Sequence, residues 1–257
     1  MVSTVTSYQF ITQNLARSLA QTASKPDVSH ETTYYLAHIH NVTSVEQFVG
    51  DFRLFSYAMK AYGLADMTYA KAFLRKVLTE GVADPSSFAN KLVDTRYREF
   101  AAAFNFASLG EQATRTTAAT SGTVERYVRQ SLEQDAGETD QGVQLALYFE
   151  RKAPTLKTAY QILADKALLQ VAQTTLGISP LTSMASIDRQ AAMLAKKIDF
   201  SDFQHPTKLR AFLQRFSARW ETEYGQTTTP SILINQTITT AVSASTLASL
   251  QNLKLGS

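Results

Sequence analysis

The sequence contains no cysteine, which excludes disulfide frameworks, thiol catalysis and cysteine-ligated metal sites. Glycine and proline are also scarce, at 10 and 6 of 257 residues, which argues against a chain of many short strands and turns. The composition is otherwise ordinary for a folded protein, because 44% of the residues are hydrophobic and 18% are charged. These absences leave helices as the expected building element.

Long apolar runs and long runs of basic residues are missing as well. No stretch approaches the ~18 apolar residues of a membrane-spanning helix, so we expect no membrane insertion. The 25 basic and 22 acidic residues are interleaved without a run of four basic residues, so we expect no nucleic-acid partner. The first residues, Met1 to Tyr8, lack the features of a cleaved signal peptide. We therefore expect a protein that is cytoplasmic or exported without such a signal.

Apolar residues recur at spacings of three and four along most of the chain, which predicts an all-α fold. One example is the helix expected over residues 44–63, whose aromatic residues Phe48, Phe52, Phe55 and Tyr62 share one face that should lie in the core. The weakly periodic residues 107–122 predict a linker or long loop. The other predicted helices cover residues 7–23, 29–39, 66–79, a segment from Asp84-Pro85, a segment from Thr95, and residues 123–134, 141–151, 158–177, 186–197, 206–224 and 231–250.

A capping pattern occurs twice, 114 residues apart. Ser44 to Gln47 and Thr158 to Gln161 both have the hydroxyl and glutamine spacing of a capping box. Both predicted helices also end at a glycine with the same separation. The identities in this register are Tyr34/Tyr148, Gln47/Gln161, Asp51/Asp165, Leu54/Leu168, Ala58/Ala172 and Gly63/Gly177.

These matches predict a tandem duplication of a roughly five-helix unit that forms a pseudo-symmetric helical bundle. The alternative is a chance self-match of low-complexity helical sequence. The predicted parts are an N-terminal repeat (1–106), a connecting loop (107–126), a C-terminal repeat (127–224) and a C-terminal helical tail (225–257). The repeat residues Asp51, Gly63, Asp165 and Gly177 are expected to be structural.

Few residues have a pattern that indicates chemistry. Asp51 and Asp165 occupy equivalent positions, so they form either a catalytic pair from the two halves or two acids that each order a neighbouring arginine or lysine. His38 and His40 would diverge on a helix, which argues against a metal pair. We find no phosphate-binding loop or known catalytic motif, and therefore expect no catalytic, cofactor-binding or metal residues and no cofactor.

Two short charged clusters have two interpretations each. The segments Asp94 to Arg98 and Glu150 to Lys152 are either a binding surface or helix-terminal caps and charges. The second interpretation is the simpler one, because acids at helix starts and bases at helix ends are common.

The C-terminal tail is uncharged from Gln226 to Asn252. Small and apolar residues recur there at helical spacing, which permits close packing between helices. The tail is therefore a candidate docking or polymerising helix, with packing on its own domain as the alternative. The candidate interaction residues are Ile234, Ile238, Ala241, Ala244 and Ala248.

Several segments resemble an uncharacterised alphaproteobacterial family whose members lie in flagellar gene clusters. The matching segments are residues 51–64, 69–78, 103–106, 146–152 and 162–168, including the sequence Asp-Phe-Arg-Leu-Phe-Ser-Tyr that begins at Asp51. The resemblance implies a bacterial, flagellum-associated role with flagellar proteins as partners, and it supplies no catalytic residues.

The sequence thus supports three hypotheses. The first is a non-enzymatic structural or assembly protein of the flagellum that acts through protein–protein contacts, with a homo-oligomer left open. The second is a cytoplasmic export chaperone or regulator of flagellar subunits. The third is a wall hydrolase that uses Asp51 and Asp165, for which a double Asn variant is the test.

Overall fold

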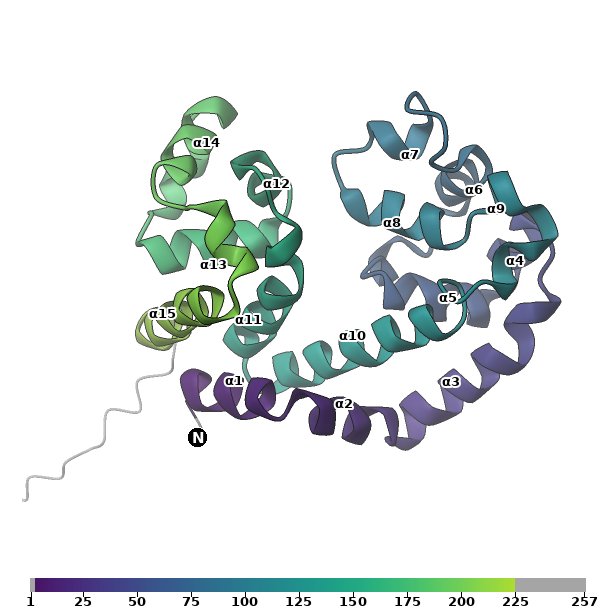
Figure 1. Cartoon of the computed structure of the whole chain (residues 1–257), viewed down its shortest axis with the longest axis horizontal. Helices are drawn as coiled ribbons and strands as arrows, with labels where there is room; N and C mark the ends of the chain where they lie inside the picture. The colour runs from purple at the N-terminus through teal and green to yellow at the C-terminus, as the bar shows by residue number, and fades with distance from the viewer. Residues whose placement is uncertain (1–2, 225–257) are drawn as a thin grey trace, which may run out of the picture. The chain divides into compact units, whose positions relative to one another are not determined.

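The structure is a computed structural model that describes residues 3–224, which belong to a single packed unit (Figure 1). Every regular element in this range is a helix, which confirms the predicted all-α fold. The α-helices are α1 (Thr4–Gln13), α2 (Leu15–Ala23), α3 (Pro26–His38), α4 (Val45–Gly50), α5 (Phe52–Ala61), α6 (Lys71–Glu80), α7 (Phe88–Lys91), α8 (Thr95–Ala103), α9 (Phe106–Leu109), α10 (Ser121–Thr139), α11 (Gln141–Lys152), α12 (Ala159–Leu163), α13 (Lys166–Leu176), α14 (Ile187–Ala195) and α15 (Pro206–Tyr224). Short 3₁₀ helices are η1 (Ile39–Asn41), η2 (Ala65–Met67), η3 (Gly110–Arg115), η4 (Ala153–Thr155), η5 (Pro180–Met184) and η6 (Phe200–Gln204).

The first hydrophobic core is rich in aromatic side chains and involves helices from α3 to α10. Phe48 on α4 is fully buried, and its ring centroid lies 4.6 Å from that of Phe104 and 5.9 Å from that of Phe55. Tyr57 on α5 stacks on Tyr127 of α10 at 3.8 Å. Such aromatic contacts add to the burial of apolar area in stabilising this half.

The second core is more aliphatic and lies among α11, α12, α13, α14 and α15. Its centre contains Ile162, Val171 and Leu213, with Phe149 stacked on Phe212 at 5.3 Å. Trp220 on α15 packs directly against Gly142 on α11, where a Cβ atom would approach the indole to 2.2 Å. The glycine therefore sets the close approach of these two helices.

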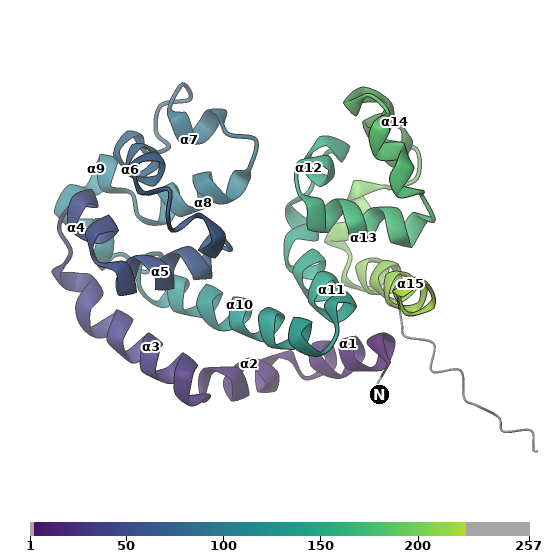
Figure 2. The same cartoon turned by 180° about the vertical axis from the view of Figure 1, so that it is seen from behind.

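Two segments connect the cores. Helix α10 packs on α5 in the first half and on α11 in the second, and α2 lies beside it (Figure 2). Helix α1 packs on α11 and α15, so the first helix of the chain completes the second core through Tyr8. The two halves are thus joined both by α10 and by α1–α2.

The order of elements recurs along the chain. The series α3, η1, α4, α5, η2, α6 has the counterpart α11, η4, α12, α13, η5, α14. Gly63 and Gly177 both have positive φ, at 71° and 63°, and each ends its helix with the same two backbone hydrogen bonds. These bonds are Gly63 N–H to Lys60 O, Leu64 N–H to Met59 O, Gly177 N–H to Thr174 O and Ile178 N–H to Gln173 O. The recurrence is consistent with the predicted duplication.

Asp51 and Asp165 divide two segments that the sequence predicted as single helices. Asp51 separates α4 from α5, and Asp165 begins α13 after α12. Each carboxylate accepts two backbone N–H groups of the following helix, as an N-terminal cap does. The break also changes which side chains face inward, because Phe52 is exposed although its spacing predicted a core position.

Other helix boundaries also differ from the predictions. The stripe over residues 7–23 is interrupted at Asn14, so that α1 and α2 reach different cores. Helix α3 begins at Pro26 rather than near Ser29, because proline is favourable at the first helical position. Asp84-Pro85 does not begin a helix; Asp84 accepts from Ser86 in a turn and α7 starts at Phe88.

The predicted connecting loop, residues 107–126, contains the end of α9, η3 and the start of α10. Its small residues pack into the first core, where Ala113 and Ala119 are fully buried. Thr114 Oγ1 donates to the Val42 carbonyl at 2.8 Å, and Tyr35 Oη donates to the Ala119 carbonyl at 2.6 Å. The prediction of a loop over these residues was therefore wrong. Small residues give weak hydrophobic periodicity in the sequence even when they are helical and buried. The candidate interaction residues of the tail, Ile234 to Ala248, lie outside the described residues.

Candidate functional site: a polar cleft between the two cores

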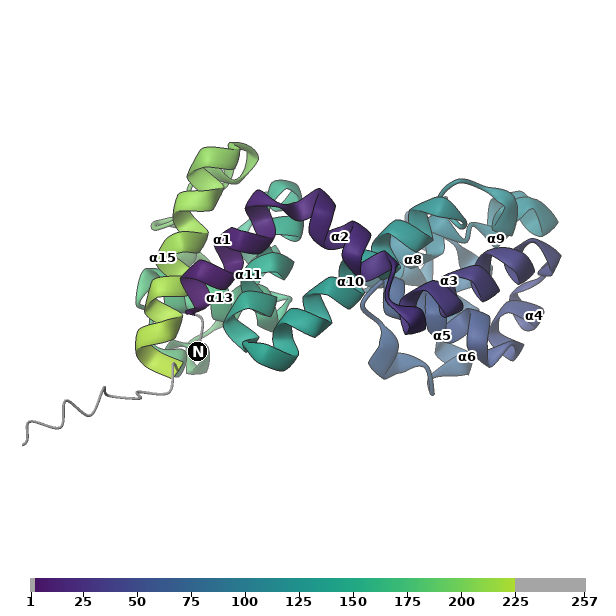
Figure 3. The ribbon, with the colours of Figure 1, turned by 90° about the horizontal axis from the view of Figure 1, so that it is seen from below.

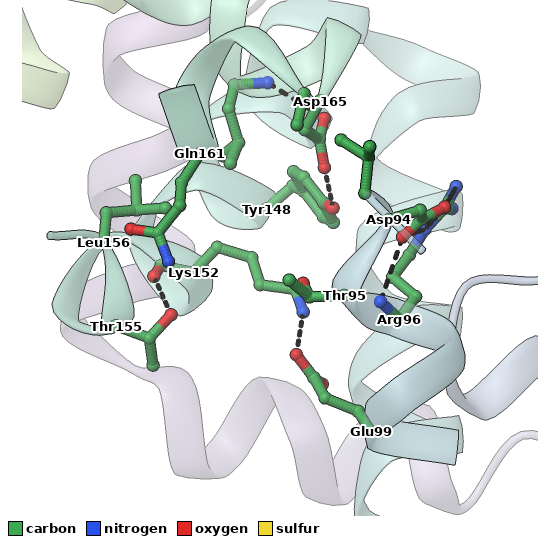
Figure 4. Close-up of a pocket in the computed structure, with 13 residues that line it drawn as sticks. Asp94, Thr95, Arg96, Glu99, Tyr148, Lys152, Thr155, Leu156, Gln161 and Asp165 are labelled. Atoms are coloured by element: carbon green, nitrogen blue, oxygen red, sulfur yellow. Dashed lines mark hydrogen bonds and ion pairs between the residues drawn. The ribbon is translucent and has the colours of Figure 1, made fainter. Parts of the chain in front are cut away.

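A polar cleft of about 530 Å³ is lined by both halves of the described unit. A narrower cavity of about 60 Å³ shares Asp94, Arg96, Tyr148 and Asp165 with it (Figure 4). The first half contributes the end of α5 and the start of α8, and the second half contributes α11 and the start of α13. Because this surface is concave and polar and combines residues of both halves, we consider it the candidate functional site.

The pair Asp94–Arg96 forms the wall from the first half. Asp94 caps α8 by accepting the Arg96 N–H, and the Arg96 guanidinium donates to both carboxylate oxygens at 2.7–3.0 Å. Arg96 Nη1 also donates to the Gly63 carbonyl at 2.5 Å. Burial lowers the pKa of Arg96, but the bonds to Asp94 outweigh it and raise that pKa. Arg96 is therefore a fixed cation that ties α8 to the end of α5.

The pair Tyr148–Asp165 forms the opposite wall. Asp165 Oδ1 accepts the backbone N–H groups of Ala167 and Leu168, and Oδ2 accepts the Tyr148 hydroxyl at 2.5 Å. Burial and the neighbouring Asp165 charge raise the pKa of Tyr148, so the phenol stays protonated and donates. The cap of α13 and the tyrosine of α11 thus hold each other in place.

An ion pair joins the two walls at the narrow end. Lys152 Nζ on α11 lies 2.8 Å from Glu99 Oε1 on α8, and both line the small cavity (Figure 4). Arg126 of α10 reaches the other Glu99 oxygen at 3.2 Å. Glu99 therefore connects three helices from the two halves.

The floor of the cleft contains a buried acid. Glu133 on α10 has a side chain that is only 1% exposed and lies 2.7 Å from Arg151 Nη2 and 3.0 Å from Arg129 Nε. Arg151 also donates to Gln130 Oε1 at 3.1 Å. Two guanidinium groups thus flank one carboxylate and compensate the charge of the buried acid. This triad fixes α10 against α11.

Four acids of the cleft and its narrow cavity are thus engaged with neighbouring groups. Asp94, Glu99, Glu133 and Asp165 each have a partner with opposite charge or a donated hydrogen bond. Such a surface offers oriented carboxylate, amide and phenol groups to a polar partner. Its geometry is suited to recognition of a polar surface.

The structure places the sequence candidates separately. Asp165 lines the cleft, whereas Asp51 caps α5 and is not among the residues that line it. Arg53 pairs with Glu31 at 2.9 Å instead of with the Asp51 side chain. His38 Nδ1 bonds the Tyr34 carbonyl, and within residues 3–224 no group of three or more potential metal ligands is assembled. Gly63 lines the cleft, and Gly177 ends α13 beside Arg219.

The clusters Asp94 to Arg98 and Glu150 to Lys152 proved more informative than the matched acids. Both lie at helix ends, as the simpler interpretation predicted, and both also supply cleft or floor residues. Glu133 gave no signal in the sequence, since one acid in a polar helix is ordinary. Its partner Arg129 lies four residues earlier on the same helix, a spacing that permits pairing, but its partner Arg151 comes from α11 and cannot be paired with it by spacing.

Comparison with known proteins identifies a family. Residues 61–209 match the model of a protein family of unknown function, DUF1217. The chain belongs to the DUF1217 family. The X-ray crystal structure of protein AGR_C_984 from Agrobacterium tumefaciens is similar at 49% sequence identity and a TM-score of 0.80, over 87% of this chain and 97% of that chain. A search of curated proteins finds no significant match.

The DUF1217 match has a clear relation to the cleft. All residues that line the cleft and its narrow cavity lie between 61 and 209. Helix α1 and the first part of the first core lie outside that range. The segment that the family model describes is therefore the segment that builds both walls of the cleft.

Proposed function

We propose that this DUF1217 protein is a non-enzymatic, flagellum-associated structural or assembly protein that acts through protein–protein contacts. The flagellar setting rests on the resemblance of segments such as residues 51–64 and 146–152 to a family found in flagellar gene clusters. The family membership itself carries no function. Two structural observations support an interaction role.

The observation that carries the proposal is an exposed apolar surface on the second half, here called the α14 patch. Leu181, Met184 and Ile187 follow at intervals of three residues along η5 and the start of α14, and they are 74%, 87% and 64% exposed. Tyr160 on the adjoining α12 is also exposed, and its hydroxyl donates to Asp188 at 2.8 Å. Grouped apolar side chains on a surface are typical of protein-binding sites.

The use of the cleft acids supports the same proposal. Asp94 and Asp165 cap helices, and Glu99 and Glu133 form ion pairs that connect the helices. Carboxylates bound in this way stabilise a rigid scaffold. A rigid scaffold with an exposed apolar patch is suited to binding another protein.

A complementation assay tests the proposal. A deletion strain should lose swimming motility, and the native gene should restore it. The triple variant Leu181→Ser, Met184→Ser, Ile187→Ser should fold normally but restore motility poorly and recover fewer flagellar proteins in a pull-down. Tyr69→Ser is the matched control, because Tyr69 is 79% exposed on the first half. Normal motility in the deletion strain, with no flagellar protein recovered, would reject the proposal.

The same pull-down distinguishes the proposed structural role from the chaperone hypothesis. A structural component should be recovered with the flagellar fraction, whereas an export chaperone should remain in the cytoplasm bound to an exported subunit. The hydrolase hypothesis predicts loss of function in the double variant Asp51→Asn, Asp165→Asn at unchanged folding. The proposed role predicts that this double variant swims normally once its thermal stability is shown to be adequate.

A further inference from the structure

Helix α1 occupies a groove that belongs to the distant part of the chain. It lies across α11 and α15, as Figure 3 shows, and its contacts with α2 are few in comparison. Tyr8 is fully buried in the second core, with Ile11 packed against the same cluster. Thr4 Oγ1 donates to Asp140 Oδ2 at 2.5 Å and fixes the start of α1 to the start of α11. The groove is therefore a helix-binding site that recognises the face bearing Thr4 and Tyr8.

Few side chains attach α1 to the groove, although this helix completes the second core. Thr4 and Tyr8 are its buried residues, and its sequence from Thr4 to Gln13 contains no charged side chain. Among residues 3–224 the buried Tyr8 hydroxyl has no hydrogen bond of ordinary geometry, and the Glu150 carboxylate is the acid beside it. Burial, and then the neighbouring Glu150 charge, raise the Tyr8 pKa. A helix held by few side chains can detach at low cost compared with the rest of the core.

Asn14 is the point at which α1 turns away from α2. Its backbone leaves the helical region, with φ −118° and ψ 31°. Its side-chain amide donates to the Phe10 carbonyl at 3.0 Å, the bond that the Asn14 N–H would make in a continuous helix. Asparagine competes with the backbone in this way, which favours a break.

The sequence itself favours a straight helix through this point. Tyr8, Ile11, Leu15 and Leu19 recur at spacings of three and four, which is one continuous apolar stripe. In the folded chain the stripe is divided, because Leu19 packs on the first core while Tyr8 and Ile11 pack on the second. The apolar stripe thus favours a continuous helix, whereas the Asn14 side chain and the tertiary packing favour the break, so two conformations compete at this point.

We propose that α1 is an exchangeable helix, which can bind either the α11–α15 groove of its own chain or the same groove of another copy of this chain. When α1 and α2 straighten at Asn14, Tyr8 and Ile11 leave their own groove and enter that of the second copy, whose α1 enters the first. The groove already binds α1 in the single chain. A second copy presents the identical helix and can therefore make the identical contacts. This inference is independent of the flagellar proposal. It predicts a reciprocal dimer formed by domain swapping.

The hinge gives the first test, in the full-length protein. Asn14→Ala should favour the continuous helix, since alanine has the highest helix propensity, and Asn14→Gly should oppose it. The equilibrium constant for straightening one hinge should be about fivefold larger with Ala than with Gly. A swapped dimer straightens two hinges, so its association constant should be about 25-fold larger in Asn14→Ala than in Asn14→Gly. Light scattering after size-exclusion chromatography over a concentration series measures this ratio.

The absence of cysteine allows a second, direct test. Two full-length single variants, Thr4→Cys and Asp140→Cys, are mixed and treated with a short bis-maleimide, with each variant alone as control. A covalent heterodimer forms efficiently only when α1 of one copy lies on α11 of the other. The double variant Thr4→Cys, Asp140→Cys reports the unswapped chain as an internally linked monomer.

The outcomes decide the inference. Heterodimer crosslinking above both controls, increased by Asn14→Ala in both chains, supports helix exchange. Equal association of Asn14→Ala and Asn14→Gly, together with internal crosslinks only, overturns it. Circular dichroism shows whether Thr4→Cys or Asp140→Cys reduces the folded fraction. In that case the comparison of Asn14→Ala with Asn14→Gly still tests the inference, because neither of these variants alters the groove.

Discussion

The same tyrosine and the same aspartate have different partners in the two halves. In the first half, Arg53 stacks on Tyr34 with its guanidinium carbon 3.7 Å from the ring centroid. The position equivalent to Arg53 in the second half is Ala167, and there Tyr148 instead donates its hydroxyl to Asp165. The Tyr148 ring lies under a different arginine, with the Arg151 guanidinium carbon 5.2 Å from its centroid. The comparison teaches that the repeated residues build the scaffold, while the unmatched neighbours decide which groups each repeated residue contacts.

The two cores also differ in the size of the side chains at matched positions. Phe48 and Phe55 in the first half correspond to Ile162 and Leu169 in the second. The first core is closed by its own segment of chain, with α10 and the residues before it, whereas the second takes Tyr8 from α1. The second half is therefore the less self-sufficient of the two.

The largest expected effect compares two buried centres. Phe48→Ala should destabilise the protein by about 3–5 kcal/mol, because it removes a ring that contacts several others. Ile162→Ala should cost less, about 2–3 kcal/mol, since the side chain is smaller and has no ring contacts. Chemical denaturation followed by circular dichroism measures both. A larger loss for Ile162→Ala would reverse our ranking of the two cores.

The next comparison sets a buried acid against an exposed one. Glu133→Ala should cost about 3–5 kcal/mol, because Arg129 and Arg151, whose side chains are only 12% and 23% exposed, lose their carboxylate. Glu31→Ala in the first half removes the partner of Arg53 but should cost about 1 kcal/mol or less, since both side chains are about one-third exposed. Urea unfolding midpoints provide the test. Equal losses would show that the Glu133 triad adds no more than a surface pair.

The matched caps give a smaller and sharper contrast. Asp51→Ala should cost about 1 kcal/mol, the usual value of an N-terminal cap. Asp165→Ala should cost about 2 kcal/mol, because Tyr148 also loses its acceptor. In a Tyr148→Phe background the cost of Asp165→Ala should fall to that of Asp51→Ala. Thermal unfolding of the four variants tests this, and an unchanged cost in that background would refute the coupling.

The smallest effect concerns pH. Burial raises the pKa of Glu150, and Arg129 and Arg210 only partly offset it, so the folded state favours the protonated acid. The resulting stability is present below the unfolded pKa of about 4.3 and is lost as the pH rises through the folded pKa. Glu150→Gln should therefore melt a few degrees above the native protein at pH 7 and at the same temperature near pH 4. A constant difference across this pH range would exclude titration of Glu150 as its cause.

The sequence predicted the helices and their ends well where local chemistry decides. The glycines at 63 and 177 end their helices, and α15 covers the predicted residues 206–224. It failed at Asp51 and Asp165, because an acid on an apolar helix is ambiguous between a polar face and the cap of a new helix. The candidate site was predictable only in fragments: Asp94 and Arg96 form a visible charged cluster, but the facing residues come from the other half of the chain.

Helix α1 has a consequence for the order of folding. Thr4 and Asp140, which bond each other, are 136 residues apart, and α15 is synthesised later still. Tyr8 therefore finds its site only after almost the whole described chain exists, and the closure of so long a loop is slow relative to local helix contacts. During synthesis α1 presents its tyrosine and isoleucine to the surroundings, so ribosome-bound chains should be most prone to aggregation or to capture by other proteins just before α15 emerges.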